Sequence, residues 1–153
     1  MDTALVYTPA LDSYDFGPEH PLRPERVKLA VDLLGSYGLV SSRDARSSAA
    51  LHTIAPAAAQ DLDLLRVHDP SYLEAVMRAS ADPRIPVGHG IGPGDTPAFS
   101  GMHEAAALVA GASCAGMRLL LAGDAQRALA PAGGLHHAHR DRAAGFCVYN
   151  DAA

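Results

Sequence analysis

The pattern of apolar and polar residues divides the chain into short apolar runs and longer stretches with helical spacing. The first run, Ala4–Thr8, contains strand-favouring residues and is bounded by aspartate and proline, which predicts a buried strand. Apolar residues recur at helical spacing across residues 20–39, where Pro24 can occupy the first turn and Gly38 is a helix-stop signal. Residues 41–48 are polar, and this pattern predicts a loop.

The middle of the chain predicts two short helices followed by a long irregular segment. The helices fall within residues 55–80, and the second has Asp69 as its N-cap and Pro70 at its first position. Residues 82–97 contain four glycines and four prolines, so no regular element is expected there. A loop of this length inside a compact domain is typically functional or disordered.

The last third of the chain predicts its longest helix. This helix spans roughly Gly101–Ala122, and its many small residues indicate close packing against other elements on more than one side. Residues 127–134 then predict a brief strand that ends in a glycine turn. The alternation of strands and helices indicates an α/β domain with a mostly parallel sheet, and no linker divides the chain in two.

The composition is typical of one soluble globular domain. The chain has 153 residues, of which 48% are apolar and 19% are charged. Alanine supplies much of the apolar fraction and tryptophan is absent, so large core-forming side chains are scarce. The net charge is −5 and Lys28 is the only lysine, which argues against a nucleic-acid-binding surface.

The chain is expected to be cytoplasmic and to have no membrane partner. Its first residues lack the basic and apolar regions of a signal peptide, and no apolar run reaches the roughly 18 residues of a transmembrane helix. Cys114 and Cys147 are too few and too far apart for a disulfide framework, which fits reduced thiols. Cys147 lies between Phe146 and Val148 and is expected to be a buried thiol rather than a nucleophile.

Histidine and glycine are concentrated in the segment GGLHHAHRDRAAGFCVYND, residues 133–151. His136 and His137 follow a glycine pair, and in a glycine-flanked turn both imidazoles can approach one cavity. Because histidine titrates near neutral pH, two together can serve as base and acid at a hydrolytic centre. The spacing alone leaves a structural role and adventitious metal binding equally open.

The sequence contains no complete metal site. A catalytic zinc needs three or more ligands with convergent geometry, but no histidine has an aspartate two residues before it, and no HExxH motif occurs. His103 and Glu104 lie near a helix start and are expected to form a solvated pair. The glycine run GHGIGPGD matches neither GxGxxG nor a phosphate-binding loop, and it lacks the lysine of the latter.

Four motifs follow one another along the chain: HPLRPERV, LLRVHDPSYLEAV, GDTPAFSGMHEAAALVAGAS and the block GGLHHA…GFC…ND. Together they resemble the histone deacetylase superfamily, most closely the bacterial acetoin utilization deacetylases, and the resemblance covers nearly the whole chain. It implies an α/β fold of the arginase-like kind, an open parallel sheet with helices on both faces. It also implies zinc-dependent hydrolysis of an N-acetyl group from a protein lysine or a small acetylated amine.

The resemblance implies catalytic roles for His136 and His137. They match the family's tandem histidines, which handle the proton of the attacking water and that of the leaving amine. Gly145 and Phe146 match residues that line the narrow channel for the acyl-lysine. Ala144 stands where serine is common in the family, a departure that does not touch the chemistry.

Two further positions match substrate-binding residues of the family. Asp95 matches a loop aspartate that hydrogen-bonds the substrate's backbone at the rim in many eukaryotic relatives. Arg26 matches an arginine near the internal cavity thought to accommodate released acetate. Thr96 stands where asparagine or cysteine is usual, again without touching the chemistry.

The resemblance also implies that part of the family's active site lies beyond the GFC…ND block. The zinc ligands, the oxyanion tyrosine and the aspartates that orient the two histidines all come later in the family. Residues 1–153 are therefore expected to be the amino-terminal portion of a single, truncated deacetylase domain. Zinc is expected in the complete domain but not in this chain alone, which should be poorly soluble or loosely packed and inactive.

Two other interpretations stay open at this point. The chain can be a non-catalytic remnant that keeps the channel wall and binds an acyl ligand or a protein. It can also be a fragment with no independent function. In the deacetylase interpretation its partner is an acetylated lysine or a small acetylated amine.

Overall fold

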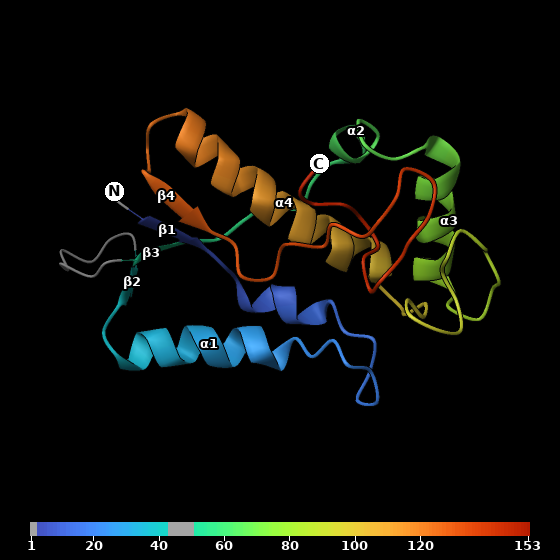
Figure 1. Cartoon of the computed structure of the whole chain (residues 1–153), viewed down its shortest axis with the longest axis horizontal. Helices are drawn as coiled ribbons and strands as arrows, with labels where there is room; N and C mark the ends of the chain where they lie inside the picture. The colour runs from blue at the N-terminus through green and yellow to red at the C-terminus, as the bar shows by residue number, and fades with distance from the viewer. Residues whose placement is uncertain (1–2, 43–50) are drawn as a thin grey trace.

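Four short strands form one parallel sheet (Figure 1). The computed structural model describes residues 3–42 and 51–153. Within them, β1 (Thr3–Val6) pairs in parallel with β3 (Leu51–Ile54) on one side and with β4 (Arg127–Leu129) on the other. The parallel sheet and the strands expected near residues 4 and 127 are therefore confirmed.

The edge strand β2 (Val40–Ser42) corrects part of the sequence prediction. It pairs in parallel with β3, so the strand order is β2-β3-β1-β4. The predicted loop over residues 41–48 is wrong for Ser41 and Ser42, and residues 43–48 lie outside the described residues. An edge strand pairs through backbone groups along one side only, so a polar composition does not prevent it from forming.

Helices lie on both sides of this sheet (Figure 1). α4 (Met102–Leu121) packs against β1 and β4, whereas α1 (Glu25–Ser36) lies on the other side, near β2 and the short 3-10 helix η1 (Pro9–Ser13). α3 (Pro70–Ala81) follows the one-turn helix α2 (Asp61–Leu64) and packs beside α4. The expected class, an arginase-like open parallel sheet with helices on both faces, is confirmed.

The small residues of α4 allow the close packing that the sequence predicts. A Cβ atom on Gly111 would lie 2.0 Å from the backbone oxygen of Ala57, and one on Gly116 would lie 3.3 Å from the Cβ of Ala128. The helix therefore touches a loop on one side and the sheet on another. By length and composition α4 could also cross a membrane, a property that core helices share, and many of its residues are buried.

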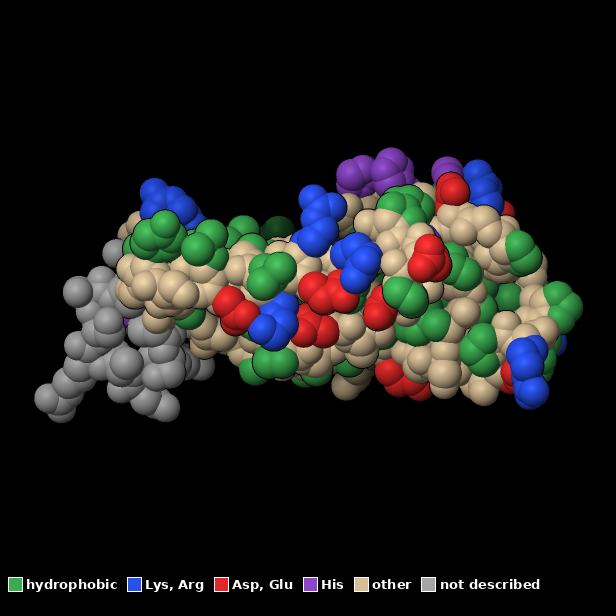
Figure 2. Space-filling model, turned by 90° about the horizontal axis from the view of Figure 1, so that it is seen from below, with side chains coloured by type: hydrophobic (Ala, Val, Ile, Leu, Met, Phe, Trp, Pro, Cys, Tyr) green, Lys and Arg blue, Asp and Glu red, His purple; other side chains and the backbone are tan. Residues whose placement is uncertain are grey.

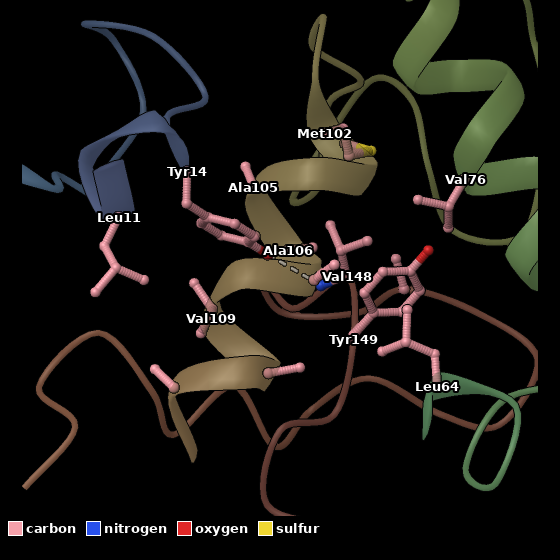
Figure 3. Close-up of a cluster of buried hydrophobic side chains, with 14 of the residues drawn as sticks. Leu11, Tyr14, Leu64, Val76, Met102, Ala105, Ala106, Val109, Val148 and Tyr149 are labelled. Atoms are coloured by element: carbon pink, nitrogen blue, oxygen red, sulfur yellow. Dashed lines mark hydrogen bonds between the residues drawn. The ribbon is translucent and has the colours of Figure 1, made fainter. Parts of the chain in front are cut away.

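One part of the hydrophobic core joins η1, α4, α3 and the carboxy-terminal segment (Figure 3). Tyr14 points from the η1 side toward Val148, and Tyr149 lies between Val76 of α3 and Leu64 of α2. All five of these side chains are buried. Val148 and Tyr149 thus pack into the core between the helices.

The glycine- and proline-rich segment 82–97 forms no helix or named strand, as expected. Within it, Gly88 and Ile91 pair across a tight turn whose two central residues have positive φ, +54° for His89 and +73° for Gly90. A backbone hydrogen bond joins this turn to Ala143, whose N–H donates to the His89 carbonyl at 2.8 Å. This contact holds the loop that carries Asp95.

Candidate active site

His136 and His137 protrude from a turn that follows β4, here called the histidine turn (residues 133–139). The centroids of their two imidazole rings lie 4.4 Å apart, with a tilt of 49° between the planes. Both side chains are exposed, and Figure 2 shows histidine side chains gathered along one edge of the surface. Within the described part of the chain neither ring makes a hydrogen bond. The two adjacent rings are therefore open to solvent.

The backbone of the histidine turn is held by Asp151 and Asn150. The Asp151 carboxylate accepts hydrogen bonds from the N–H groups of Gly134 at 3.0 Å and Leu135 at 2.5 Å. The Asn150 side-chain amide donates to the carbonyl oxygens of His136 at 3.2 Å and Ala138 at 3.1 Å. The two residues therefore satisfy backbone groups on both sides of the histidine pair.

The buried His68 adds a third link to the same turn. Its Nδ1 lies 3.0 Å from the carbonyl oxygen of His139, and its Nε2 lies 3.1 Å from the backbone nitrogen of Asn150. Because a carbonyl can only accept and an N–H can only donate, Nδ1 carries the proton and Nε2 accepts. Burial lowers the pKa of His68, which favours this neutral form.

Gly145 and Phe146 form the tip of a second tight turn, which lies against the histidine turn. Ala144 and Cys147 exchange two backbone hydrogen bonds across it, and both central residues have positive φ, +53° for Gly145 and +71° for Phe146. A Cβ on Gly145 would lie 3.1 Å from atoms of the His137 side chain and would push it away slightly, so glycine suits both the positive φ and this close contact. The Cys147 thiol is buried, as expected, and burial raises its pKa.

The Tyr14 hydroxyl forms hydrogen bonds to the backbone of this second turn. It donates to the carbonyl oxygen of Phe146 at 2.7 Å and accepts from the N–H of Val148 at 3.0 Å. The side chain is almost fully buried, and burial raises its pKa. The hydrogen bonds offset part of the strain of a non-glycine residue with positive φ at Phe146.

His20 brings Asp95 and Phe146 together. The ring centroids of His20 and Phe146 lie 4.6 Å apart in an edge-to-face arrangement. The Nδ1 of His20 accepts from the N–H of Leu22, so its Nε2 donates to the backbone oxygen of Asp95 at 3.1 Å. The Asp95 side chain itself is exposed. Thus the loop with Asp95, the Phe146 turn and the histidine pair form one continuous region.

Arg26 lies apart from this region. It is exposed on α1 and does not line the pocket of about 200 Å³ that lies beside the histidine turn. Arg23, three residues earlier, does line that pocket, together with Asp12, Val27 and Leu135. The acetate-cavity role of Arg26 stays a prediction.

His103 differs from its expected role. Its Nδ1 lies 2.9 Å from the hydroxyl of the buried Tyr149, and Glu104 accepts a hydrogen bond from Ser80 at 2.8 Å. The prediction of a solvated His103–Glu104 pair is therefore wrong for His103, because the start of α4 faces α3 and the core. This contact cannot be read from the local sequence.

The described residues do not by themselves supply a zinc site. Within residues 3–42 and 51–153, no three histidine, cysteine, aspartate or glutamate side chains lie together in a way that could hold a metal ion. A catalytic zinc needs about three protein ligands. The adjacent imidazoles of His136 and His137 fall short of that set.

Sequence reasoning alone did not assign roles to several residues that shape the site: Tyr14, His20, His68, Asn150 and Asp151. The signal was present in part, because Asn150 and Asp151 close the GGLHHA…GFC…ND block and His68 lies in the VHDPSYL motif. The motifs do not show which of these residues contact one another across the fold.

Comparisons with known proteins agree with the motifs. Residues 20–153 match the family model of the histone deacetylase domain. The acetoin utilization protein AcuC of Bacillus subtilis is 37% identical over 156 residues, which cover 99% of this chain and 38% of that relative. The histone deacetylase clr6 of Schizosaccharomyces pombe is 33% identical over 159 residues, covering 98% of this chain and 36% of clr6.

Solved structures show the same similarity. The crystal structure of an HDAC homologue from Aquifex aeolicus has a TM-score of 0.84 at 28% identity and covers 99% of this chain and 39% of that chain. The crystal structure of an HDAC homologue complexed with SAHA has a TM-score of 0.79 at 27% identity and covers 98% of this chain and 38% of that chain. The chain thus spans about two fifths of the length of these relatives. Because the family model matches most of the chain, and the fold and motifs agree with it, this chain belongs to the histone deacetylase family.

Proposed function

We propose that this chain carries the acid–base part of a deacetylase active site and acts on an N-acetyl-lysine or a small acetylated amine. The observation that supports this most directly is the exposed pair His136–His137, whose rings lie side by side next to the Gly145–Phe146 turn. Two imidazoles in contact at a surface turn can both reach one reacting group.

Amide hydrolysis needs two proton transfers, and the histidine pair can serve both. One imidazole accepts the proton of a water molecule as its oxygen attacks the acyl carbon. The other, in its protonated form, donates a proton to the amine nitrogen as the C–N bond breaks. Both roles suit a group that titrates near neutral pH.

The surroundings of the pair support an elongated substrate. Phe146 presents an aromatic ring beside His20, and Gly145 adds no side chain against the His137 ring. An alkyl chain such as that of lysine can pass along such an apolar surface with its acyl end directed at the imidazoles. Asp95, on the neighbouring loop, can then accept hydrogen bonds from the backbone of a peptide substrate.

Zinc dependence, the domain assignment and the compartment also belong to this proposal. The family resemblance implies a zinc ion that polarises the acyl carbonyl, but the described residues lack the ligand set to hold it. We therefore propose that residues 1–153 form the amino-terminal portion of one deacetylase domain whose metal ligands come from elsewhere. A cytoplasmic location stays a prediction.

The proposed function can be tested with a hybrid protein in which this chain replaces the matching 38% of Bacillus subtilis AcuC. The hybrid should hydrolyse an acetyl-lysine peptide, and His137→Ala should lower its kcat by about 10²–10⁴-fold, the usual worth of general acid–base catalysis. His139→Ala is the matched control, because His139 is exposed in the same turn and has no assigned role. A His137→Ala hybrid with the parent's turnover would contradict the proposal.

The isolated 153-residue chain provides a second test. We expect it to hold no stoichiometric zinc and to show no turnover, because the described residues lack the ligand set. Zinc content is measured after purification without a metal-affinity tag, alongside the acetyl-lysine assay. A folded monomer with one tightly held zinc and zinc-dependent turnover would exclude this interpretation.

An inactive hybrid that still binds acetylated peptide would instead favour the non-catalytic binding role.

Asp95→Asn tests the proposed rim contact. In the hybrid it should raise KM for acetylated peptides more than for small acetylated amines, since only peptides have a backbone within reach of the loop. Steady-state kinetics with both substrate classes gives the comparison. Equal changes in the two KM values would show that Asp95 does not contact the peptide backbone.

A further inference from the structure

The carboxylate of Asp151 is aimed at the backbone that carries the histidine pair. It accepts from the N–H groups of Gly134 and Leu135, which directly precede His136, and the hydroxyl of Ser113 on α4 donates to it as well. The same carboxylate therefore ties the histidine turn to the longest helix of the fold. Hydrogen bonds to a charged group are stronger than those between neutral groups.

Gly133 leaves the space that this carboxylate occupies. A Cβ atom at Gly133 would lie 2.5 Å from Oδ2 of Asp151 and 2.8 Å from Oγ of Ser113. Gly134 serves a different purpose, because its φ of +90° is rarely adopted by other residues, while a Cβ atom there would have no neighbouring atom within 4 Å. The glycine pair thus provides room for an acceptor and then a bend that points two N–H groups at it.

We propose that Asp151 is a positioning residue for the reaction, holding the imidazoles of His136 and His137 in their adjacent arrangement. Asn150 completes the same clamp from the carbonyl side through His136 and Ala138. Without the carboxylate, two adjacent N–H groups lose their acceptor and the bend at Gly134 is free to relax. This role rests on the proposed acid–base function of the pair.

The clamp is tested first in the hybrid protein by amide hydrogen–deuterium exchange, because the isolated chain is expected to be loosely packed. Asp151→Ala should speed exchange at Gly134 and Leu135 by about tenfold or more, since both amides lose a charged acceptor. Gly133→Ala should speed exchange in the same way although Asp151 is still present, because the added methyl group pushes the Asp151 carboxylate out of its position. Asp124→Asn is the control, because Asp124 is exposed in the turn after α4. Exchange in β1 should stay unchanged, which separates a local opening from a general loss of structure.

The catalytic consequence is measured in the hybrid protein. Asp151→Ala should lower kcat by about 10²-fold, because a small misplacement of reacting groups is this costly, and should leave KM within about threefold. Adding Gly133→Ala to Asp151→Ala should cost little more, since both disrupt the same contact. Asp151→Asn keeps one acceptor oxygen and should fall between the parent and Asp151→Ala.

Each result decides a separate point. Unchanged exchange at Gly134 and Leu135 would show that Asp151 does not hold the turn. Faster exchange with unchanged kcat would show that the reaction does not need the turn to be held, which overturns the positioning role. A parent hybrid without turnover would refute the proposed function and, with it, the positioning role. In that case the exchange data still decide whether the carboxylate clamps the turn.

Discussion

Helices α1 and α3 are both 12 residues long and both begin at or just after a proline, yet they are packed in opposite ways. α3 buries Tyr72, Val76 and four smaller or aliphatic residues, whereas none of the residues of α1, all of which the structure describes, is buried. Leu29 and Leu33 of α1 are 64% and 57% exposed. Figure 2 views the molecule from the side of α1 and shows apolar patches beside charged groups.

The difference follows from what each helix touches. α3 is tied to the segment that carries the candidate site, because the Tyr72 hydroxyl donates to the carbonyl of Val148 and the N–H of Asp69 donates to the carbonyl of Arg140. α1 contacts mainly η1 and the edge strand β2, and of its residues only Val27 and Val31 pack against the core, both partly buried. Two helices with similar apolar spacing are therefore packed differently: α3 is buried against the candidate site, whereas α1 leaves Leu29 and Leu33 exposed to solvent.

The largest expected effect is on the free energy of unfolding, and it compares the substitution of two tyrosines, Tyr72 in α3 and Tyr37 at the end of α1. Tyr72 is fully buried and Tyr37 is 73% exposed. Tyr72→Ala should lower the free energy of unfolding by about 3–5 kcal/mol, the usual cost of emptying a large aromatic site. Tyr37→Ala should change it by no more than about 0.5 kcal/mol. Urea unfolding followed by circular dichroism compares the two, and similar losses would refute the contrast between the helices.

A smaller loss of stability is expected when the pH is lowered, because of His68, which precedes α3. Burial lowers the pKa of His68 from its ordinary value of 6.5, so below that pH the unfolded chain binds a proton that the folded chain does not. Stability present above pH 6.5 is therefore lost as the pH falls toward the folded pKa, by at most about 1.4 kcal/mol per pH unit. The midpoint of thermal unfolding should drop on acidification from about pH 7.5 to about pH 5.5.

His68→Gln identifies the source of this pH dependence. The variant should be less stable at neutral pH, because the links to His139 and Asn150 are lost, but its stability should change less between the two pH values. The other histidines are unchanged in this variant and serve as its internal control. An equal pH dependence in parent and variant would assign the effect to other groups.

The smallest expected effect is on α1. Leu33→Gln should change the free energy of unfolding by no more than about 0.5 kcal/mol, because the side chain is mostly exposed. It should, however, reduce self-association of the chain, since exposed apolar patches favour it. Sedimentation velocity at several concentrations measures this, with Lys28→Gln on the same helix as the control. A large loss of stability would show that α1 is packed more firmly than its exposure indicates.

Several parts of the molecule could be predicted from local sequence alone. Apolar spacing and end signals locate α1, α3 and α4 to within a few residues, because a helix depends on residues that are near one another in the chain. The run of glycines and prolines in residues 82–97 likewise predicts an irregular segment. The motifs also predict the family, which the comparisons confirm.

Other parts depended on contacts between distant residues. The strand β3 has a short run, LHTI, that forms a strand because β1 and β2 lie on either side of it. Which helix is buried was likewise not determined by its own pattern, as α1 and α3 demonstrate. Sheet pairing and burial are set by partners that a local window does not contain.

The site divides in the same way. By itself the sequence determined that His136 and His137 are adjacent and follow two glycines, and that Asn150 and Asp151 come later. Only the tertiary structure decided that Asn150 and Asp151 hold the turn that carries the two histidines, and that His68, 82 positions before Asn150, bonds to the same region. The physical reason is that a hydrogen bond depends on distance in space, which follows from how the helices pack and not from separation along the chain.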